Sequence, residues 1–492
     1  MTVVSPKIDL REIEFRVLPM RTRFPFKYGI ASLTALPHLV LKVETEIDGI
    51  LTRGIASEGL PPKWFTKNPD TTFGEDLPAM LGVIGHAAEL TLARPPATFF
   101  NLWRELHEEQ ASWATAEGHP SLLANLGVSL MERALLDALC RRLGSGLHTV
   151  LRGNHLGLRL GEMRPELSGA EPSAFLPERP LSSVRARHTI GLGDPLTPAE
   201  VNDDNRAADS LPLDLETCIR TYGLTHFKIK VCGNLDLDLP RLEALAELLG
   251  PGALFTLDGN EQYAGIGAFR EHWEVWREKA KIRALLDSGL LLVEQPAHRD
   301  ESFSPSVSMD LADWPDHPAF IIDEADAGID DFPRALALGY DGVSHKNCKG
   351  IVKGLANAAT IALEEEKRGR IVHLSGEDLA NVGPFALFQD LAMMASLGIG
   401  HVERNGHHYF KGLSAWPKPV KASMLEDHGD LYGLHPEGYP TLLLQDGVLD
   451  LSSLNAAPFG PVRLLDLSSL KTVDPRDPAG FIRVGMPEDQ GL

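Results

Sequence analysis

Apolar runs that end in a charged side chain recur through the middle of this 492-residue chain. The runs between residues 225 and 350 end at Lys230, Asp258, Glu294, Asp323 and Lys346, in steps of 23 to 36 residues. A strand, a helix and two short loops need roughly 30 residues. The spacing therefore predicts a repeated βα series in which each charged side chain stands at the carboxyl end of a strand.

The series extends in both directions to eight strands. A first strand is predicted near residues 184–192, and the last two are predicted to end near His373 and Glu403. Eight βα units close a barrel, and the catalytic groups of such barrels lie at the carboxyl ends of the strands. The predicted fold class is therefore α/β, a (β/α)8 barrel of the TIM type, with an α+β N-terminal capping domain.

The capping domain is predicted from the change of pattern before the barrel. Residues 12–57 alternate as in a strand meander, with Asp48-Gly49 as a turn. Residues 75–150 have apolar side chains at helical spacing, and Gly144 is a stop signal. Strands followed by a run of helices indicate an α+β unit.

The domain boundaries follow from these patterns. We expect the capping domain at residues 1–154, completed by residues 430–492, and the catalytic barrel at residues 183–429. Residues 155–182 are rich in Pro, Gly, Glu and Ser, which indicates a connector or an insertion. Within the C-terminal part, residues 441–450 resemble a hairpin.

Charge and composition exclude several classes of function. Charged residues make up 23% and apolar residues 43%, as in globular proteins, and the net charge is −21. Such an acidic chain lacks the electrostatic footprint of a nucleic-acid binder and has little attraction for anionic membranes. The four cysteines show no metal-ligand spacing, and the N-terminus lacks the apolar core of a signal peptide. We therefore expect a cytoplasmic protein that binds neither nucleic acid nor membrane.

Three carboxylates at consecutive strand ends indicate a metal site. Asp258, Glu294 and Asp323 would repel one another if they were brought together without a cation. Mg²⁺ takes oxygen ligands in octahedral geometry and keeps positions for substrate oxygens, and Mn²⁺ is the alternative ion. A structural alternative is that each acid only caps the helix that follows it.

The lysines indicate proton transfer. Lys228 and Lys230 are two residues apart on a strand and point to one face, and Lys346 lies four units further on, across the barrel. A desolvated lysine has a lowered pKa that suits proton abstraction. Lys228 and the metal would hold a substrate carboxylate and stabilise an enediolate, while Lys230 and Lys346 would exchange protons on opposite faces. A solvated strand face or an ordinary loop lysine remains the alternative, and Lys349 competes with Lys346.

These motifs together resemble the enolase superfamily, specifically the muconate lactonizing enzyme-like branch of the mandelate racemase/muconate lactonizing enzyme family. The resemblance covers most of residues 12–415. Its matching pieces are Lys228-Ile-Lys230, Asp258-Gly-Asn260, Glu294-Gln-Pro296, Asp323-Glu324 and Lys346.

The resemblance implies a role for each of these positions. Asp258, Glu294 and Asp323 would be the Mg²⁺ ligands, with Asn260 and Glu324 as groups that orient ligands or substrate. Lys230 and Lys346 would be the acid/base pair and Lys228 the electrostatic partner. Residues near 21–28 and 58–65 of the capping domain would close over the barrel and select the substrate. A homo-oligomer is also implied.

The chain departs from the pattern of the family in two respects. It is long, with extra segments near 155–182, 195–216 and 298–316 and at the C-terminus. His373 is predicted to end the seventh strand, where the mandelate racemase-like branch has a catalytic histidine. That branch pairs the histidine with an aspartate at the place of Lys346, so His373 is expected to be structural or a substrate contact.

The function that fits these observations is proton abstraction next to the carboxylate of a small molecule. It would lead to racemisation or epimerisation, cycloisomerisation, or dehydration, as in an isomerase or a lyase. Two alternatives stay open: an aldolase-type barrel enzyme with a Schiff-base lysine, and a barrel that binds a ligand without catalysis.

Overall fold

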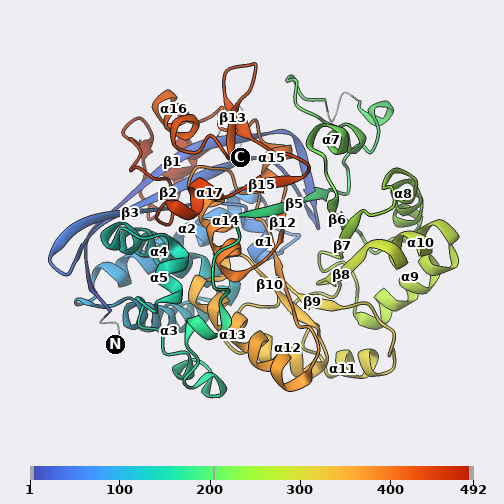
Figure 1. Cartoon of the computed structure of the whole chain (residues 1–492), viewed down its shortest axis with the longest axis horizontal. Coiled ribbons are helices and arrows are strands. Elements are labelled where there is room, and N and C mark those ends of the chain that lie inside the picture. The colour runs from blue at the N-terminus through green and yellow to red at the C-terminus, as the bar shows by residue number, and fades with distance from the viewer. Residues whose placement is uncertain (1–4, 203–205, 487–492) are drawn as a thin grey trace.

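Eight parallel strands close into a barrel in the computed structural model, which describes residues 5–202 and 206–486 (Figure 1). The strands are β5 (Ser183–Ile190), β6 (His226–Lys230), β7 (Leu254–Asp258), β8 (Leu290–Glu294), β9 (Phe320–Ile322), β10 (Gly342–His345), β11 (His373–Gly376) and β12 (His401–Arg404). Each pairs with the next, and β12 pairs with β5 to close the ring. The prediction of a (β/α)8 barrel is confirmed.

Helices follow the strands and cover the outside of the barrel. They are α7 (Leu215–Tyr222), α8 (Leu235–Leu248), α9 (Ile266–Glu278), α10 (Ala280–Gly289), α11 (Pro305–Ala312), α12 (Asp331–Leu338), α13 (Ile351–Arg368), α14 (Ala386–Leu397), α15 (Gly406–Tyr409) and α16 (Lys418–Asp427). Apolar strand residues such as Phe255 and Phe320 pack against helix residues such as Phe269 and Trp276. Such layered burial is the main stabilising contribution in this fold.

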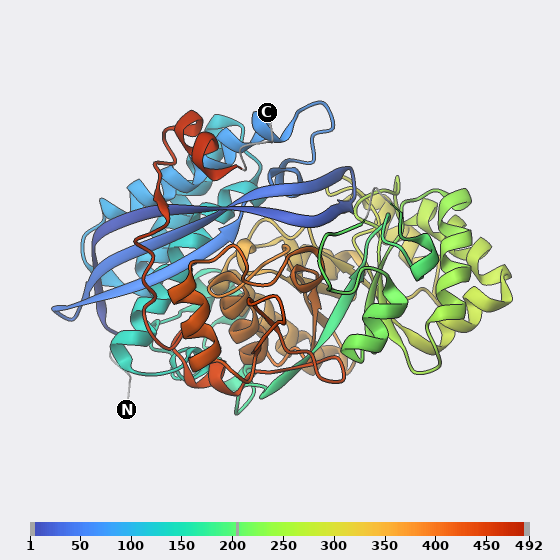
Figure 2. The same cartoon turned by 90° about the horizontal axis from the view of Figure 1, so that it is seen from above.

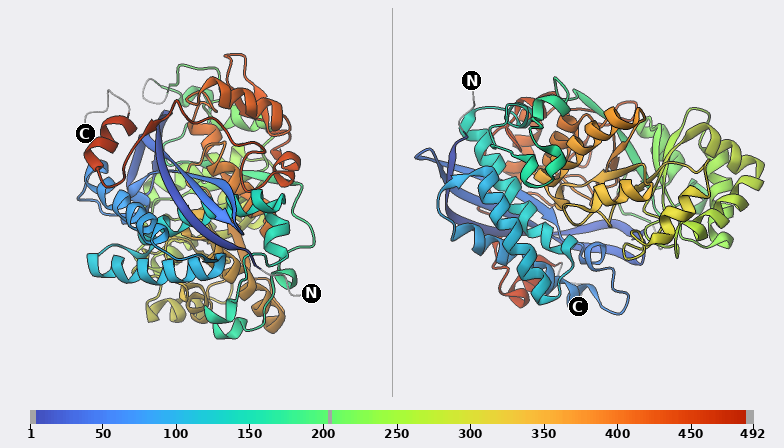
Figure 3. Two further views of the ribbon diagram at one scale, coloured as in Figure 1. Left: turned by 90° about the vertical axis from the view of Figure 1, so that its left-hand side faces the viewer. Right: turned by 90° about the horizontal axis from the view of Figure 1, so that it is seen from below.

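A second unit precedes the barrel, as expected. It contains β1 (Lys7–Tyr28), β2 (Ala31–Ile47), β3 (Ile50–Gly59), α1 (Pro62–Thr66), α2 (Phe73–Leu92), β4 (Ala97–Thr98), α3 (Phe99–Glu117), α4 (Ser121–Leu143) and α5 (Leu147–Arg152). The three long strands form an antiparallel sheet, and α2 and α4 pack on it (Figure 3). Asp48 and Gly49 both have positive φ, which is the two-residue hairpin turn predicted between β2 and β3.

Short helices lie in the segment at 155–182 and in two loops of the barrel. They are η1 (Leu160–Glu162), η2 (Pro165–Leu167), α6 (Pro172–Phe175), η3 (Pro198–Glu200) and η4 (Asn347–Lys349). The buried Arg164 donates hydrogen bonds to Ile329 O, Thr360 Oγ1 and Asn357 Oδ1. The first extra segment is therefore fastened to the barrel. The segment at 195–216 is described only in part, because residues 203–205 lie outside the described ranges.

Strands of the C-terminal part pair with strands of the capping unit and of the barrel. The strands are β13 (Tyr432–Leu434), β14 (Pro440–Leu442), β15 (Val448–Asp450) and β16 (Lys471–Thr472), with helices α17 (Ser452–Ala456) and α18 (Pro478–Gly485). The hairpin expected at residues 441–450 is confirmed at its turn, where Gln445 and Val448 pair across Asp446-Gly447, but its arms separate, because β14 pairs with β13 and β15 pairs antiparallel with β5 of the barrel. β16 pairs with β1, and α18 packs on β1 and β2 (Figure 2). Residues 487–492 of this tail lie outside the described ranges.

Two further features concern single elements. His373 begins β11 instead of ending it, so it stands at the amino end of the barrel, opposite the carboxyl ends that carry the predicted site. The expectation of a substrate contact is therefore wrong for this residue. Within the described residues, the helices are too short or too polar for any of them to span a lipid bilayer.

Candidate active site

The barrel brings the predicted site residues together. Lys228 and Lys230 lie on β6, Asp258 and Glu294 are the last residues of β7 and β8, Asp323 follows β9, and Lys346 follows β10. The strand register places Lys230 beside Asp258 and Asp258 beside Glu294. All six side chains are buried. The regular strand spacing seen in the sequence accounts for this convergence.

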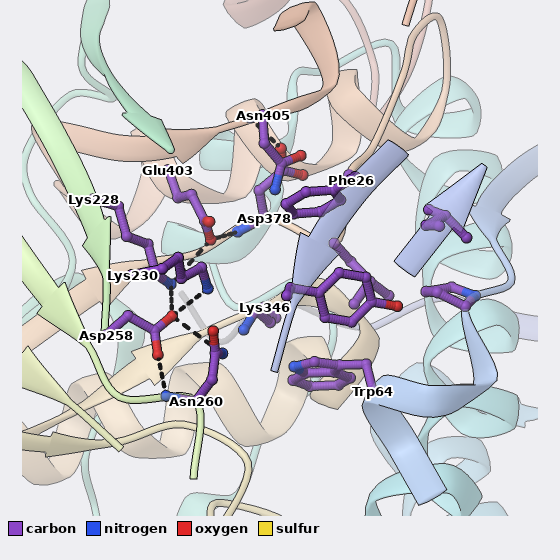
Figure 4. A pocket seen from close by; sticks show the side chains of 15 residues that line it. Phe26, Trp64, Lys228, Lys230, Asp258, Asn260, Lys346, Asp378, Glu403 and Asn405 are labelled. Carbon is purple, nitrogen blue, oxygen red and sulfur yellow. Dashed lines mark hydrogen bonds and ion pairs between the residues drawn. The ribbon is translucent and has the colours of Figure 1, made fainter. Parts of the chain in front are cut away.

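Lys228 is the most highly coordinated charge of the site (Figure 4). Its Nζ lies 2.9 Å from Asp258 Oδ2, 2.7 Å from Glu294 Oε2, 2.8 Å from Glu377 Oε2 and 3.2 Å from Glu403 Oε2. Burial alone would lower the pKa of Lys228, but these four carboxylates together hold its pKa well above the usual value. Lys228 is therefore an ammonium group at the centre of an acidic cluster.

Asp258 is held in place from two sides. Its Oδ2 lies 2.5 Å from Lys230 Nζ, and its Oδ1 accepts a hydrogen bond of 2.8 Å from the backbone N–H of Asn260. Burial raises the pKa of Asp258, but Lys228 and Lys230 outweigh it and leave the pKa below the usual value. Asn260 has a φ of 43°, in the left-handed region that asparagine tolerates better than most residues. The backbone of Asn260 therefore helps to fix the Asp258 carboxylate, and the orienting role expected for Asn260 stays a prediction.

Asp323 makes the matching contacts on the other side of the barrel. Its carboxylate forms a close ion pair with Lys346 and accepts a hydrogen bond from Ser344, and Lys349 Nζ lies 3.3 Å from Oδ1. Burial opposes ionisation of Asp323, but Lys346 and Lys349 hold its pKa well below the usual value. The pKa of Lys346 is raised, because Asp323 outweighs the effect of burial. The lowered lysine pKa expected from desolvation is therefore wrong for Lys228 and Lys346.

Two acidic residues of the cluster were missed in the sequence. Glu377 directly follows β11 and pairs with the buried Arg187 of β5, and Glu403 of β12 accepts a hydrogen bond of 2.7 Å from Thr189. Glu403 stood at a predicted strand end, so its position was available as a signal. Glu377 was hidden by the error at His373, because the strand runs three residues further than expected.

The carboxylates fit the donor set of a hard divalent cation. Asp258, Glu294 and Asp323 converge on one place and offer only oxygen ligands. Burial and the neighbouring Asp258 and Glu377 raise the pKa of Glu294 well above its usual value, which reflects uncompensated negative charge around it. Asn260 Oδ1, beside Asp258, is buried and accepts no hydrogen bond from the described residues. A cation in this place would relieve the repulsion among the acids.

A narrow cavity lies over these charges. Lys228, Lys230, Asp258, Asn260 and Lys346 form its barrel side, and Phe26, Tyr28, Leu33, Pro61 and Trp64 of the capping domain form its other side (Figure 4). Trp64 Nε1 donates a hydrogen bond of 3.1 Å to Glu324 Oε1, and Lys346 Nζ lies 4.5 Å from the centre of the Trp64 ring. Burial and the neighbouring Asp323 raise the pKa of Glu324 to about 7.

A polar clamp holds α1 of the capping domain over the cavity. Arg299, in the extra segment at 298–316, pairs with Glu261 at 2.8 Å and donates hydrogen bonds to the carbonyls of Phe65 and Trp64. Lys67 Nζ lies 3.1 Å from Glu261 and donates to Asn260 O. Lys67 after α1 and Arg299 of the extra segment thus both contact Glu261, which lies three residues after β7.

Comparison with known proteins supports the fold of the chain but does not identify its reaction. The sequence matches no protein-family model and no curated protein. Among solved structures, the chain resembles 2-chloromuconate cycloisomerase from Rhodococcus opacus, with a TM-score of 0.58, 14% identity, and coverage of 96% of this chain and 99% of that one. It also resembles N-succinyl Arg/Lys racemase from Bacillus cereus, with a TM-score of 0.56, 17% identity, and coverage of 94% and 99%.

A third solved structure carries both a metal and a ligand. It is the dipeptide epimerase from Enterococcus faecalis complexed with Mg and the dipeptide L-Leu-L-Tyr, with a TM-score of 0.54, 16% identity, and coverage of 82% of this chain and 92% of that one. The chain therefore has the fold of structures from the mandelate racemase/muconate lactonizing enzyme family. At these identities the likeness is evidence for the fold alone.

Proposed function

We propose that the chain is an enzyme of the enolase superfamily that removes the α-proton of a small-molecule carboxylate to give an enediolate. The observation that carries the proposal is that Asp258, Glu294 and Asp323 end three consecutive strands between Lys230 and Lys346, and that Asp258 and both lysines line one cavity. β6 and β10 are four strands apart in a closed ring of eight, so the two lysines face each other across the barrel. That arrangement gives a bound substrate one ammonium or amine group on each face.

The metal ligands in this proposal are Asp258, Glu294 and Asp323, with Mg²⁺ as the ion and Mn²⁺ as the alternative. When bound, the ion would supply positive charge that stabilises the negative charge gained by the substrate carboxylate on deprotonation. Asn260 and Glu324 would orient this set, because they contact Asp258 and the capping residue Trp64 respectively.

The lysines would move the proton. Lys230 and Lys346 hold their Nζ atoms at the cavity wall, where one can take the α-proton and the other can return a proton to the opposite face. Return to the opposite face gives racemisation or epimerisation, whereas ring closure or loss of a leaving group gives cycloisomerisation or dehydration. Lys228 lies beneath them, and its ammonium group balances the acids and attracts the substrate carboxylate.

The capping residues would exclude water from the reacting atoms. Phe26 and Trp64 cover the charged wall, and exclusion of water strengthens the electrostatic interactions within the cavity. A Schiff-base mechanism stays the alternative, because a nucleophilic lysine must be unprotonated just as a lysine base must, so the lysines alone do not separate the two mechanisms.

Solvent exchange tests the proposal directly. The whole chain is incubated in D₂O with Mg²⁺ and pooled acids, including dipeptides, N-acylated amino acids, acid sugars and cyclic acids, and NMR follows loss of the α-proton signal. The solved neighbours named above act on compounds of some of these classes. We expect exchange with one class, and its loss in Lys230→Ala and Asp258→Asn.

A matched control separates chemistry from folding. Lys367 pairs only at the surface with Glu364, so Lys367→Ala should exchange at the wild-type rate. Exchange that persists unchanged in Lys230→Ala would refute the assigned role of that lysine. A covalent adduct trapped by borohydride with a carbonyl substrate would favour the Schiff-base alternative.

A further inference from the structure

A second cluster of ligand-type side chains lies at the seam where the barrel closes. His188 belongs to β5, Cys218 to α7 and His408 to α15, and all three are buried. The neighbours of His188 on β5, Arg187 and Thr189, bond Glu377 and Glu403 of the acidic cluster. Successive strand side chains point to opposite faces, so His188 points away from that cluster.

The three side chains are close enough to share an ion. Their candidate donor atoms all lie within 4.8 Å of one another, and Cys218 Sγ lies 3.7 Å from His408 Nδ1. A tetrahedral zinc ion places thiolate sulfur and imidazole nitrogen about 3.6 Å apart, given the usual bond lengths. The Cys218–His408 pair already has this spacing, and the third donor needs a movement on the order of 1 Å.

Both histidines face a polar group with their other ring nitrogen, as metal-binding histidines usually do, and the His188 contact is within hydrogen-bond distance. His408 Nε2 lies 3.9 Å from Asp194 Oδ2, and Asp194 is itself fixed by the N–H of Gly191 at 2.8 Å and by the hydroxyl of Tyr409 at 2.5 Å. His188 Nδ1 lies 3.1 Å from His407 Nε2. These contacts leave His408 Nδ1 and His188 Nε2 for an ion.

We propose that His188, Cys218 and His408 bind a borderline d-block cation of the Zn²⁺ class. A thiolate with two imidazoles is a donor set that prefers such ions over Mg²⁺. The positive charge of the nearby Arg23 guanidinium would by itself oppose the binding of a cation. Asp209 compensates that charge, because it accepts two hydrogen bonds from the guanidinium. This site is separate from the carboxylate site, and it does not depend on the proposed function.

The ion would act as a structural tie. It would join the first strand, the first outer helix and the segment after the eighth strand. It would also support the capping hairpin, since Phe24 packs against His408 at 5.0 Å and Phe26 stacks on Tyr409 at 4.0 Å. Phe26 also lines the cavity over the lysines, so an ion at the seam would help to hold the wall of that cavity in place.

Cobalt substitution tests the proposal without an activity assay. The metal-free whole chain is titrated with Co²⁺ in the presence of excess Mg²⁺, which occupies the carboxylate site, and absorption spectra are recorded. We expect one equivalent of Co²⁺ to produce a thiolate-to-metal charge-transfer band that Zn²⁺ abolishes by displacement. Only a cysteine ligand gives this band, so a Co²⁺ ion among the carboxylates does not produce it.

Matched variants identify the ligand. Cys140 is equally buried but lies in α4 of the capping domain, so Cys140→Ala should keep the band, and Asp258→Asn should keep it as well. Cys218→Ala should abolish it, and His408→Gln should weaken Co²⁺ binding at least tenfold. A wild-type chain without the band, or a band that survives in Cys218→Ala, would overturn the proposal and leave the cluster as packed imidazole and thiol groups. The wild-type result stands even where a variant fails to fold.

Discussion

At the scale of single residues, Lys228 shows how the barrel tolerates many buried acids in one place. Asp258, Glu294, Glu377 and Glu403 all contact its Nζ, so a single ammonium group separates four carboxylates that would otherwise repel one another. A buried charge that loses a partner is strongly destabilising, and here four carboxylates share one ammonium group, although Asp258 and Glu377 also contact Lys230 and Arg187. The free energy of unfolding should therefore depend on this side chain more than on other lysines of the chain.

The variant Lys228→Met tests that dependence. We expect it to lower the free energy of unfolding by roughly 3–5 kcal/mol, because it leaves buried carboxylates uncompensated. Mg²⁺ should restore more stability to the variant than it adds to the wild type, since a cation bound by Asp258 and Glu294 replaces the lost positive charge. Urea unfolding with and without Mg²⁺ measures both effects. Equal stability of variant and wild type would contradict this account of the site.

Glycine 54 is a second residue on which the packing of two elements depends. A β-carbon at Gly54 of β3 would stand 2.0 Å from Ala134 O of α4, whereas a β-carbon at Gly82 of α2 would meet no atom within 4 Å. We expect Gly54→Ala to cost several kcal/mol, about 3 or more by comparison with overpacked cores. Gly82→Ala should instead stabilise by about 0.5–1 kcal/mol, as in other helix interiors. Thermal unfolding of the two variants measures the contrast, and similar values would show that α4 can move away from the sheet.

At the scale of elements, the sequence predicts where a strand lies along the chain better than it predicts which strand it pairs with. The ends of β6, β7 and β8 were predicted at Lys230, Asp258 and Glu294, because each apolar run stops at a charge that the barrel interior excludes. The hairpin at 441–450 was right at its Asp446-Gly447 turn but wrong for its arms, because alternation specifies a strand but does not identify its partner. The end of β11 was misplaced by three residues, since Leu374, Ser375 and Gly376 continue the strand without an apolar pattern.

The docking of α1 is an element-scale feature that no sequence pattern predicted. Arg299 holds this helix through the carbonyls of Trp64 and Phe65 and through Glu261. We expect Arg299→Ala to speed amide hydrogen exchange in residues 62–67 by roughly tenfold to a hundredfold, because local opening loses several hydrogen bonds. Mass spectrometry of peptides from this segment measures the rate.

A neighbouring arginine provides the control for this experiment. Arg270 pairs with Glu274 on the exposed side of α9, so Arg270→Ala should leave the exchange of residues 62–67 unchanged. Exchange that is equally slow in Arg299→Ala would show that other contacts of α1, such as the hydrogen bond from Trp64 to Glu324, hold the helix without the arginine.

At the scale of the whole molecule, the sequence predicted the architecture and most of the charged centre, but not what joins the units. The period of βα units specifies a barrel because few other folds place charges at intervals of about 30 residues. Contacts such as Arg23 with Asp209, or β16 with β1, join residues hundreds of positions apart, and nothing in the local pattern encodes such pairs. The seam cluster of His188, Cys218 and His408 was missed for the same reason.

The burial of neutral histidines between the two units makes the stability of the whole chain depend on pH. His38 of β2 is fully buried, bonds Ser57 Oγ at 3.0 Å and packs edge-on against Trp416 at 5.8 Å. Burial, reinforced by the charge of Arg133, lowers the pKa of His38 to about 3. In the unfolded chain a histidine has a pKa near 6.5. Between these values the unfolded state binds a proton that the folded state does not.

The sign of the effect follows from this difference. The stability contributed by neutral His38 is complete above about pH 6.5 and is lost as the pH falls toward 3, at about 1.4 kcal/mol for each pH unit. His38→Gln can still bond Ser57 but does not titrate, so its free energy of unfolding should fall less steeply over the same range. Urea unfolding at pH 4.5, 5.5 and 7.5 measures the slopes, and the values above pH 6.5 show the cost of the substitution alone. Parallel slopes for wild type and variant would mean that His38 is protonated in the folded chain, which would require Arg133 or Trp416 to move away from it.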